Sequence, residues 1–256
     1  MFTRINTGFR LSSPILMGLA LTACGGGGGG GGDDLTTAPP EQPTTELQAG
    51  GYVTEIAFED GTTVGAATLL SPTGEFVVLV DIDDITVGTL DFGSGGTITG
   101  SGTDYVFDGT SWQTQGGTIS GEATSETTAT ITATAPGYES VSTLERDDQY
   151  SDLGVTLAGL SGTYTMSAPG IFTTSVTIAS DGIITGSDET GCVFNGNVAI
   201  PDPSINVYEV TYSANNCADS QRNGDYSGLG AYDPDIGEIQ FAGAGNQAAS
   251  FFIGTK

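Results

Sequence analysis

The sequence predicts an all-β fold, an antiparallel meander of strands that forms one or two small β-barrels or sandwiches. From Tyr52 onward apolar residues recur at every second position, which is typical of half-buried strands rather than of helices. Glycine is abundant, with 41 residues among 256, and threonine-rich runs alternate with it. Threonine favours strands and glycine favours tight turns. Turn signals separate the runs at short intervals, as in meanders, at residues 71–74, 108–109, 135–137, 180–182 and 233–235.

Residues 1–23 have the pattern of a secretory signal peptide. Arg4 and Arg10 supply a positively charged start, and the apolar run 14–21 (PILMGLAL) is too short to span a bilayer. The string Leu21-Thr22-Ala23-Cys24 follows and resembles the lipobox of bacterial lipoproteins. The resemblance implies that the leader is cut before Cys24, whose thiol then carries a diacylglyceryl group and whose amine carries an acyl chain such as palmitate. The alternative is an ordinary signal peptide followed by an unrelated cysteine.

Residues 24–50 are expected to form a lipidated cysteine and a disordered tether. Eight glycines follow Cys24, and a threonine- and proline-rich run (TTAPPEQPTTE) comes next; both are linker compositions. Two or more acyl chains hold a protein stably on a membrane. In the lipoproteins that the lipobox resembles, an Asp after the cysteine tends to keep the protein at the inner membrane. Gly25 stands there in this chain, so we expect the outer membrane, on its periplasmic or its surface face.

The folded part divides into one β module at residues 51–150 and a second at 155–256. In the first, the run 128–133 (TATITA) places alanine and isoleucine on one face and threonine on the other. In the second, Tyr208, Val210 and Tyr212 share a face, and residues 251–253 are expected to form a closing core strand. Only residues 152–160 suit a short helical turn, and their two glycines weaken that prediction.

An internal echo links the two modules. GTITGS at 96–101 precedes YVFDG at 105–109, and GIITGS at 182–187 precedes CVFNG at 192–196. A shorter copy, GTISG, lies at 117–121. Duplication of a β module explains the echo, and so does convergence of glycine- and threonine-rich hairpins. The sequence leaves both explanations open.

The chain is strongly acidic. Without the leader, three basic residues remain against 31 acidic ones, a net side-chain charge of −28. Such a surface repels nucleic acid, so we expect no nucleic-acid partner. It attracts cations, and scattered acids also suit a solvated surface in a saline habitat.

Cys192 and Cys217 are expected to form a disulfide. A signal peptide implies an oxidising compartment, and with Cys24 bound to lipid these two cysteines form an even pair. A metal-binding or reactive thiol pair is the weaker alternative, because the chain has no histidine and the spacing matches no zinc motif.

No catalytic residue and no cofactor site is predicted, so an enzyme is not favoured. The absence of histidine removes Ser-His-Asp and Cys-His systems, and the only lysine is the last residue. No phosphate-binding glycine loop occurs, since the eight glycines do not follow a strand. Two carboxylates suffice for glycoside hydrolysis, which 31 acids neither support nor exclude. Trp112, the lone tryptophan, is expected to pack rather than to form a glycan platform.

Two acidic strings are weak calcium candidates. One is Asp81-Ile82-Asp83-Asp84, and the other contains Asp233, Asp235 and Glu238 around Pro234 and Gly237. The second string does not fit the calcium-binding EF-hand loop, because its glycine is the fifth residue and no acid follows six places after Glu238. Turn chemistry accounts for every residue of it, so a turn is the favoured interpretation.

The C-terminal hundred residues resemble uncharacterised β-rich lipoproteins of Gram-negative bacteria. The strings that carry the resemblance are LSGTY at 160–164, ITGS at 184–187, Gly191-Cys192, Asn216-Cys217 and YSGL at 226–229. The resemblance implies a compact β-barrel or sandwich and supports the disulfide, and it implies no activity. The glycine run after Cys24 is also similar to surface lipoproteins of the transferrin-binding-protein type, which are built of β-barrels.

The sequence therefore predicts a lipid-anchored, acidic protein of the cell envelope, most simply a non-catalytic binding or interaction module for a protein or small-molecule ligand. A carboxylate-based hydrolase acting on glycans, a ligand-binding barrel like those surface lipoproteins, and a passive surface component are the alternatives. A binding module predicts an exposed apolar patch or a barrel mouth. A hydrolase predicts two acids facing each other in a cleft, one with a raised pKa.

Overall fold

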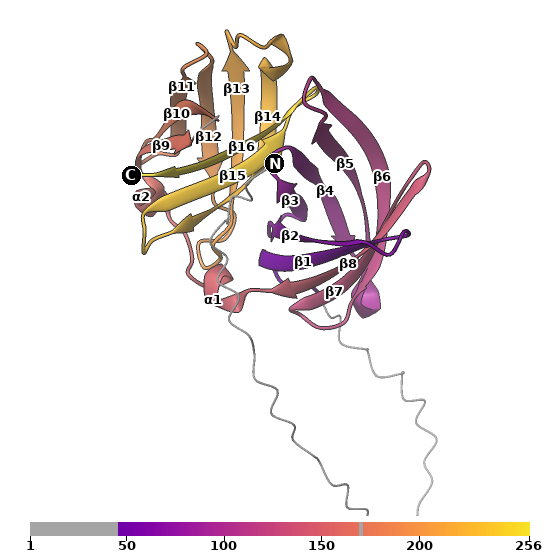
Figure 1. The fold of residues 1–256 in the computed structure, drawn as a ribbon. Helices are drawn as coiled ribbons and strands as arrows, with labels where there is room; N and C mark the ends of the chain where they lie inside the picture. Colours follow the sequence, from indigo (N-terminus) through magenta and orange to yellow (C-terminus); the bar gives the residue numbers. More distant parts are fainter. Residues whose placement is uncertain (1–45, 169–170) are drawn as a thin grey trace, which may run out of the picture. The chain divides into compact units, whose positions relative to one another are not determined.

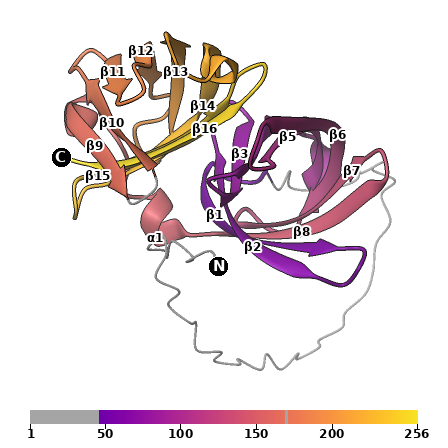
Figure 2. The ribbon, with the colours of Figure 1, turned by 45° about the horizontal axis from the view of Figure 1, so that its top comes forward.

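The computed structural model of this chain describes residues 46–168 and 171–256. The predicted leader, Cys24 and most of the predicted tether lie outside the described residues. The described part consists almost entirely of antiparallel β-strands, which confirms the predicted fold class. The strands form two closed barrels of eight strands each (Figures 1 and 2).

Barrel 1 is an up-and-down meander in which every strand pairs with the next and β8 pairs with β1. Its strands are β1 (Gly50–Phe58), β2 (Thr63–Leu70), β3 (Glu75–Asp81), β4 (Asp84–Phe92), β5 (Thr97–Phe107), β6 (Trp112–Ala123), β7 (Thr128–Ala135) and β8 (Tyr138–Arg146). A 3-10 turn, η1 (Ser94–Gly96), precedes β5. In each barrel we call the end that carries the turns after odd-numbered strands the mouth, and the opposite end the base.

Barrel 2 repeats the meander. Its strands are β9 (Gly162–Ala168), β10 (Ile171–Ile178), β11 (Ile183–Asp188), β12 (Val193–Ala199), β13 (Tyr208–Asn215), β14 (Gly224–Asp233), β15 (Glu238–Ala244) and β16 (Ala249–Thr255). It closes through a single registered pair, Thr165 with Thr255, between β9 and β16. The other neighbouring strands of this barrel share between five and seven registered pairs.

The alternation read from the sequence fixes which side chains line each lumen. Ala129 and Ile131 of β7 are buried in the core of barrel 1, as their predicted shared face requires. Tyr208, Val210 and Tyr212 of β13 are buried in the core of barrel 2. Small residues make room for the larger ones: a Cβ at Gly230 would lie within 2.5 Å of the Tyr208 ring, so only glycine fits beside it.

The predicted turns all fall between consecutive strands. The helical prediction over 152–160 is right only in part. Two four-residue helices, α1 (Asp148–Ser151) and α2 (Leu157–Leu160), connect the barrels, and residues 152–156 between them are not helical. Side chains of Asp147 and Thr156 cap the two helices by accepting backbone N–H groups.

Apolar residues of the two barrels share one buried cluster. Ile85 and Tyr105 of barrel 1 contribute to it together with Val207 and Leu229 of barrel 2. Polar bonds reinforce the contact, since the Tyr105 hydroxyl donates to the Gly245 carbonyl at 2.7 Å. The hydroxyls of Ser71 and Thr73 donate to Glu209 at 2.7 and 2.6 Å. Both barrels therefore belong to one packed body.

Among the described residues, no helix is long and apolar enough to cross a membrane.

Candidate functional site

Two carboxylates line the lumen of barrel 1 near its mouth. Ile85 and Tyr105 point outward into the cluster shared with barrel 2, so their strand neighbours point inward. Asp84 of β4 and Asp104 of β5 are these neighbours, on adjacent strands and in diagonal register, because Thr86 pairs with Asp104. The Thr86 hydroxyl donates to Asp104 at 2.7 Å. Diagonal neighbours of this kind have Cα atoms roughly 7–8 Å apart, close enough for the two charges to interact.

Burial and mutual repulsion shift the pKa of both carboxyls. Loss of hydration, followed by the charges of Asp104 and Asp81, raises the pKa of Asp84 to about 6. Burial also raises the pKa of Asp104, although the bond from Thr86 partly offsets this. Two neighbouring carboxyls whose pKa values are both raised have not been stabilised by a nearby cation.

Two aromatic rings lie at the same mouth. The rings of Phe58 at the end of β1 and Tyr138 at the start of β8 have centroids 6.0 Å apart and are tilted. Burial, and then the charges of Asp104 and Asp84, raise the pKa of the Tyr138 hydroxyl. The Tyr138 hydroxyl therefore interacts electrostatically with both carboxylates, from another wall of the same lumen. The mouth combines negative charge on one wall with aromatic surface on another.

The base of barrel 1 is closed. Large apolar side chains such as Tyr52, Phe76, Leu90 and Leu144 fill the lower lumen. Arg146 seals the end: its Nε donates to the Ala49 carbonyl at 2.9 Å, and its terminal nitrogens bind Asp148 at 2.6 Å and Asp152 at 2.8 Å. A ligand that enters this lumen must therefore come through the mouth.

The described chain supplies no cation to the carboxylates of the mouth. Its ion pairs engage Arg146 with Asp148 and Asp152, and Arg222 with Asp188. Its remaining basic residue is Lys256, whose ammonium donates to the Gly159 carbonyl and lies 5.3 Å from the Tyr164 ring centroid. Asp84 and Asp104 thus form an acidic pair without a basic partner within residues 46–168 and 171–256.

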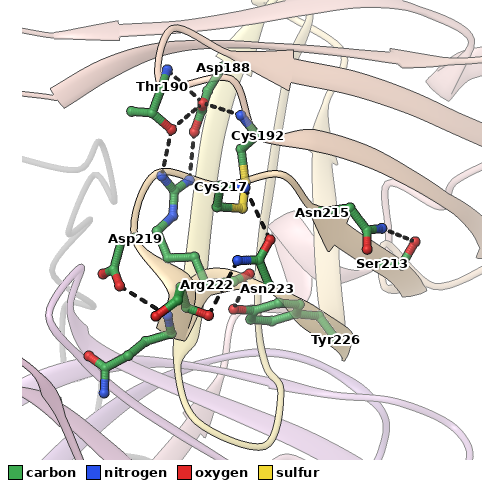
Figure 3. Close-up of a disulfide and its surroundings, with 12 residues drawn as sticks. Asp188, Thr190, Cys192, Ser213, Asn215, Cys217, Asp219, Arg222, Asn223 and Tyr226 are labelled. Carbon is green, nitrogen blue, oxygen red and sulfur yellow. Dashed lines mark hydrogen bonds and ion pairs between the residues drawn. A yellow bond between two sulfur atoms is a disulfide. The ribbon is translucent and has the colours of Figure 1, made fainter.

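The mouth of barrel 2 is built differently, around the predicted disulfide. Cys192 at the start of β12 bonds to Cys217 in the loop before β14, which confirms the pairing (Figure 3). The loop carries Arg222, which donates to Asp188 at 2.7 Å (Figure 3). The Asp188 side chain is fully buried. Its burial opposes ionisation, but the bonds from Thr190 and Arg222 prevail and hold the pKa of Asp188 below its usual value.

A small cavity of about 60 Å³ lies in the lumen of barrel 2, beneath this loop. Tyr212 is the centre of its aromatic wall, stacked on Tyr226 with centroids 5.0 Å apart. Phe194 and Phe241 meet Tyr212 edge-on at 6.0 Å, and Phe241 stacks on Phe252 at 5.1 Å. Arg222 forms part of the lining.

A wider groove of about 660 Å³ lies near the base of barrel 1, where the described chain begins. Two pairs of its polar groups already bind each other: the Gln48 amide donates to Glu126 at 3.0 Å, and Arg146 binds Asp152. Its apolar lining is discontinuous and comprises Leu47, Ala49, Pro72, Phe92 and Ile205. The mouth of barrel 1 offers the more defined chemistry.

The weak calcium candidates Asp233, Asp235 and Glu238 lie in and beside the turn between β14 and β15. Asp233 accepts the backbone N–H of Asp235 at 2.9 Å, which is turn chemistry. Within the described part of the chain, no group of three or more Asp, Glu, Cys or His side chains is arranged to hold a metal ion. Trp112 packs against the cluster shared by the barrels, as expected, with the Phe107 ring 5.5 Å away.

The sequence identified only half of the carboxylate pair. Asp84 belongs to an acidic string that is a weak calcium candidate, whereas no local motif marks Asp104. The two lie 20 residues apart, and a turn and η1 separate their strands. Only the register of β4 against β5 places both in one lumen. The sequence does place one acid at an inward position of β4 and one of β5. These acids can be recognised only when the inward face of each of the two strands is known.

In comparisons with protein-family models, with curated proteins and with solved structures, the chain has no significant match.

Proposed function

We propose that the protein is a lipid-anchored binding module of the bacterial envelope, whose barrel 1 takes a small organic cation into its mouth. The observation that carries the proposal is the pair Asp84 and Asp104, which faces a lumen closed at its base and has no basic partner in the described chain. Two partly desolvated carboxylates in this arrangement destabilise the fold near neutral pH. A bound cation relieves that repulsion, and the relief adds to the free energy of binding.

The aromatic wall suits the rest of such a ligand. An ammonium group within about 6 Å of an aromatic centroid is attracted by the negative face of the ring. Phe58 and Tyr138 offer two rings close to the carboxylates. A primary or quaternary ammonium that carries an apolar or aromatic group therefore matches both walls, and the net negative charge of the chain draws it in.

Titration of the full chain with benzylammonium tests the proposal, with benzyl alcohol as the neutral analogue. The chain carries Cys24→Ser so that neither lipid nor detergent competes. Calorimetry is expected to show benzylammonium binding at pH 7.5, at least tenfold weaker binding of benzyl alcohol, and loss of benzylammonium affinity as the pH falls below about 6, where Asp84 is protonated.

Two double variants separate the site from the charge of the whole surface. Asp84→Asn with Asp104→Asn should weaken binding at least tenfold. Glu122→Gln with Glu139→Gln removes the same charge from exposed positions on the outside of barrel 1 and should change affinity less than twofold. Equal losses in the two variants would show that only diffuse attraction is at work and would contradict the proposal.

The anchor is a second part of the proposal. The lipobox-like string before Cys24 supports lipidation and residence at the outer membrane. Replacement of Cys24 by Ser should move the natural protein from the membrane fraction to the soluble fraction. A Cys24→Ser protein that stays with membranes after a salt wash would refute the anchor while leaving the binding site untouched.

A carboxylate-based hydrolase is the second candidate, favoured by the raised pKa of Asp84, which suits a general acid near pH 6. The geometry supports it less well than binding. Asp84 and Asp104 are neighbours on one wall, whereas a glycosidase needs acids that flank the scissile bond. Release of nitrophenol from a panel of nitrophenyl glycosides, abolished by Asp84→Asn, would favour the enzyme.

A further inference from the structure

We infer that the upper lumen of barrel 2 is a second, separate binding site, which takes a small neutral molecule with an apolar body and one hydrogen-bond acceptor. The inference does not depend on the cation site in barrel 1. It rests on the cavity under the Arg222 loop, on the charge balance at its opening, and on the weakly paired wall beside it.

The cavity is confined to one level of the lumen. Below it, Tyr164, Ile178, Tyr208 and Ile239 are at most 2 % exposed and fill the barrel. Protein cores of this kind contain few voids larger than a water molecule. A cavity of about 60 Å³ exceeds the minimum for one water, about 10–15 Å³, severalfold. The space is therefore large enough for a few heavy atoms of a ligand.

The walls are mainly apolar. Val176, Ile184, Phe194, Phe241 and Phe252 line the cavity with the flexible thioether of Met166, and Thr174, Ser250 and Arg222 add polar groups. A mainly apolar cavity favours an apolar guest over ordered water, because a water needs two to four polar partners. The body of the ligand is therefore apolar.

The opening selects a neutral ligand. The Arg222 guanidinium disfavours a cation, and the fully buried carboxylate of Asp188 neutralises it, so an anion gains no net attraction there. The acidity of the whole chain repels an anion further. Of the five N–H donors of Arg222, one binds Asp188 at 2.7 Å and one approaches the Thr190 hydroxyl at 3.4 Å. A donor is left for an uncharged acceptor such as a ketone oxygen.

One wall of the cavity can move. Met166 belongs to β9 and residues 250–252 to β16, and both line the cavity. These two strands are joined by the single pair Thr165 with Thr255, near the base. Movement of β9 away from β16 at the mouth would enlarge the cavity without breaking any other registered pair of the barrel. A ligand longer than the resting cavity can thus be admitted.

A series of 2-alkanones, from butanone to nonanone, tests the inference on the full chain with Cys24→Ser by NMR titration. Affinity is expected to rise about fourfold for each added methylene, which is the transfer value for burying one, until the cavity is filled, and then to level off. At the resonances of barrel 2, the matched pentanoate and pentylammonium ions should bind at least tenfold weaker than 2-hexanone, whatever pentylammonium does at the mouth of barrel 1. Shifted resonances should include Phe194 and Phe241.

Two variants with opposite effects keep the test independent of folding. Ile184→Phe fills the cavity and should weaken binding of the longer ketones at least tenfold. Met166→Ala enlarges it and should move the optimum to a longer chain. Ketones that bind both variants like the parent, or that shift no resonance in barrel 2, would overturn the inference. Asp84→Asn with Asp104→Asn should leave the ketone affinities unchanged, so failure of one site is distinguishable from failure of the other.

Discussion

The two barrels share one plan but differ in what fills them. Each begins with a strand whose third residue is a buried tyrosine, Tyr52 or Tyr164, and each tyrosine hydroxyl donates to the carbonyl four residues earlier, of Gln48 or Leu160. Above that level, barrel 1 lines its mouth with acids and glycines, whereas barrel 2 fills the corresponding level with aromatic rings and covers it with a disulfide-linked loop. The inward positions of a strand can thus change in chemistry while the barrel that they line stays the same.

The two mouths differ in whether a buried carboxylate has a basic partner. Asp188 at the mouth of barrel 2 is fully buried but is bound by Arg222 and Thr190, and its pKa lies below the usual value. Asp84 at the mouth of barrel 1 is partly buried and has no basic partner in the described part of the chain, and its pKa rises to about 6. Both carboxylates lose hydration, and the presence or absence of a basic partner decides whether the pKa falls or rises.

The internal echo in the sequence does not mark equivalent strands. GTITGS opens β5, the fifth strand of barrel 1, and GIITGS opens β11, the third strand of barrel 2. The backbone hydrogen bonds make Gly182, before β11, equivalent to Gly74, before β3, and not to Gly96. The Gly74 carbonyl accepts from Leu90, and the Gly182 carbonyl accepts from Val198. The two barrels share an architecture, but the similar strings do not occupy equivalent strands of it.

The largest effect is expected at the cluster that joins the barrels. Leu229 is fully buried there, and Leu229→Ala should destabilise the protein by about 3–4 kcal/mol, the range for a large-to-small change in a core. Because the cluster joins both barrels, its loss should uncouple them. The Leu229→Ala protein should then unfold in urea in two transitions, one for each barrel. Leu90→Ala, whose site lies within barrel 1 alone, should cost a similar amount but leave a single, shifted transition, because the shared cluster stays intact. A Leu229→Ala protein that unfolds in one unshifted step would show that the barrels do not depend on each other through this cluster.

Loss of the disulfide should come next. The bond between Cys192 and Cys217 spans 25 residues, and Cys192→Ala with Cys217→Ala should lower stability by about 3 kcal/mol by loop entropy. The effect should be larger in barrel 2, so amide hydrogen exchange should speed up more in β12 and β14 than in the strands of barrel 1. Free thiols at both positions in unfolded, unreduced natural protein would show that the disulfide is absent and would contradict this prediction.

The smallest effect is expected at Asp84, and its sign depends on pH. Its raised pKa means that the folded state binds the proton more tightly than the unfolded chain, so stability falls as the pH rises from about 4 to about 6. Asp84→Asn removes this penalty and should stabilise the protein by about 1 kcal/mol at pH 7.5, after allowance for partial exposure, with no difference at pH 4. Denaturant unfolding at both pH values measures it.

Asp188→Asn is the matched control in the other mouth. Its carboxylate has a lowered pKa, so its contribution to stability is present above the usual range and is lost as the pH falls. The substitution should therefore destabilise the protein at pH 7.5. Effects of the same sign at both positions would remove the contrast between the two mouths.

Much of the fold could be predicted from local patterns. Alternation placed Ala129 and Tyr208 on buried faces, and glycine, proline and aspartate marked the turns, because both features depend only on a few consecutive residues. The disulfide followed from the two remaining cysteines. The helical segment was placed less well, because α1 and α2 are single turns held by caps and by their neighbours rather than by periodicity.

By itself, then, the sequence determined the class of secondary structure, the buried face of strands such as those at 128–133 and 208–212, the negative charge and the pairing of Cys192 with Cys217. The tertiary structure alone decided that sixteen strands close into two barrels, that Asp84 and Asp104 meet in one lumen, and that a cavity remains beneath Arg222. The physical reason is range: a side chain's face follows from its immediate neighbours, whereas register, closure and the space left in a lumen depend on contacts between strands far apart in the chain.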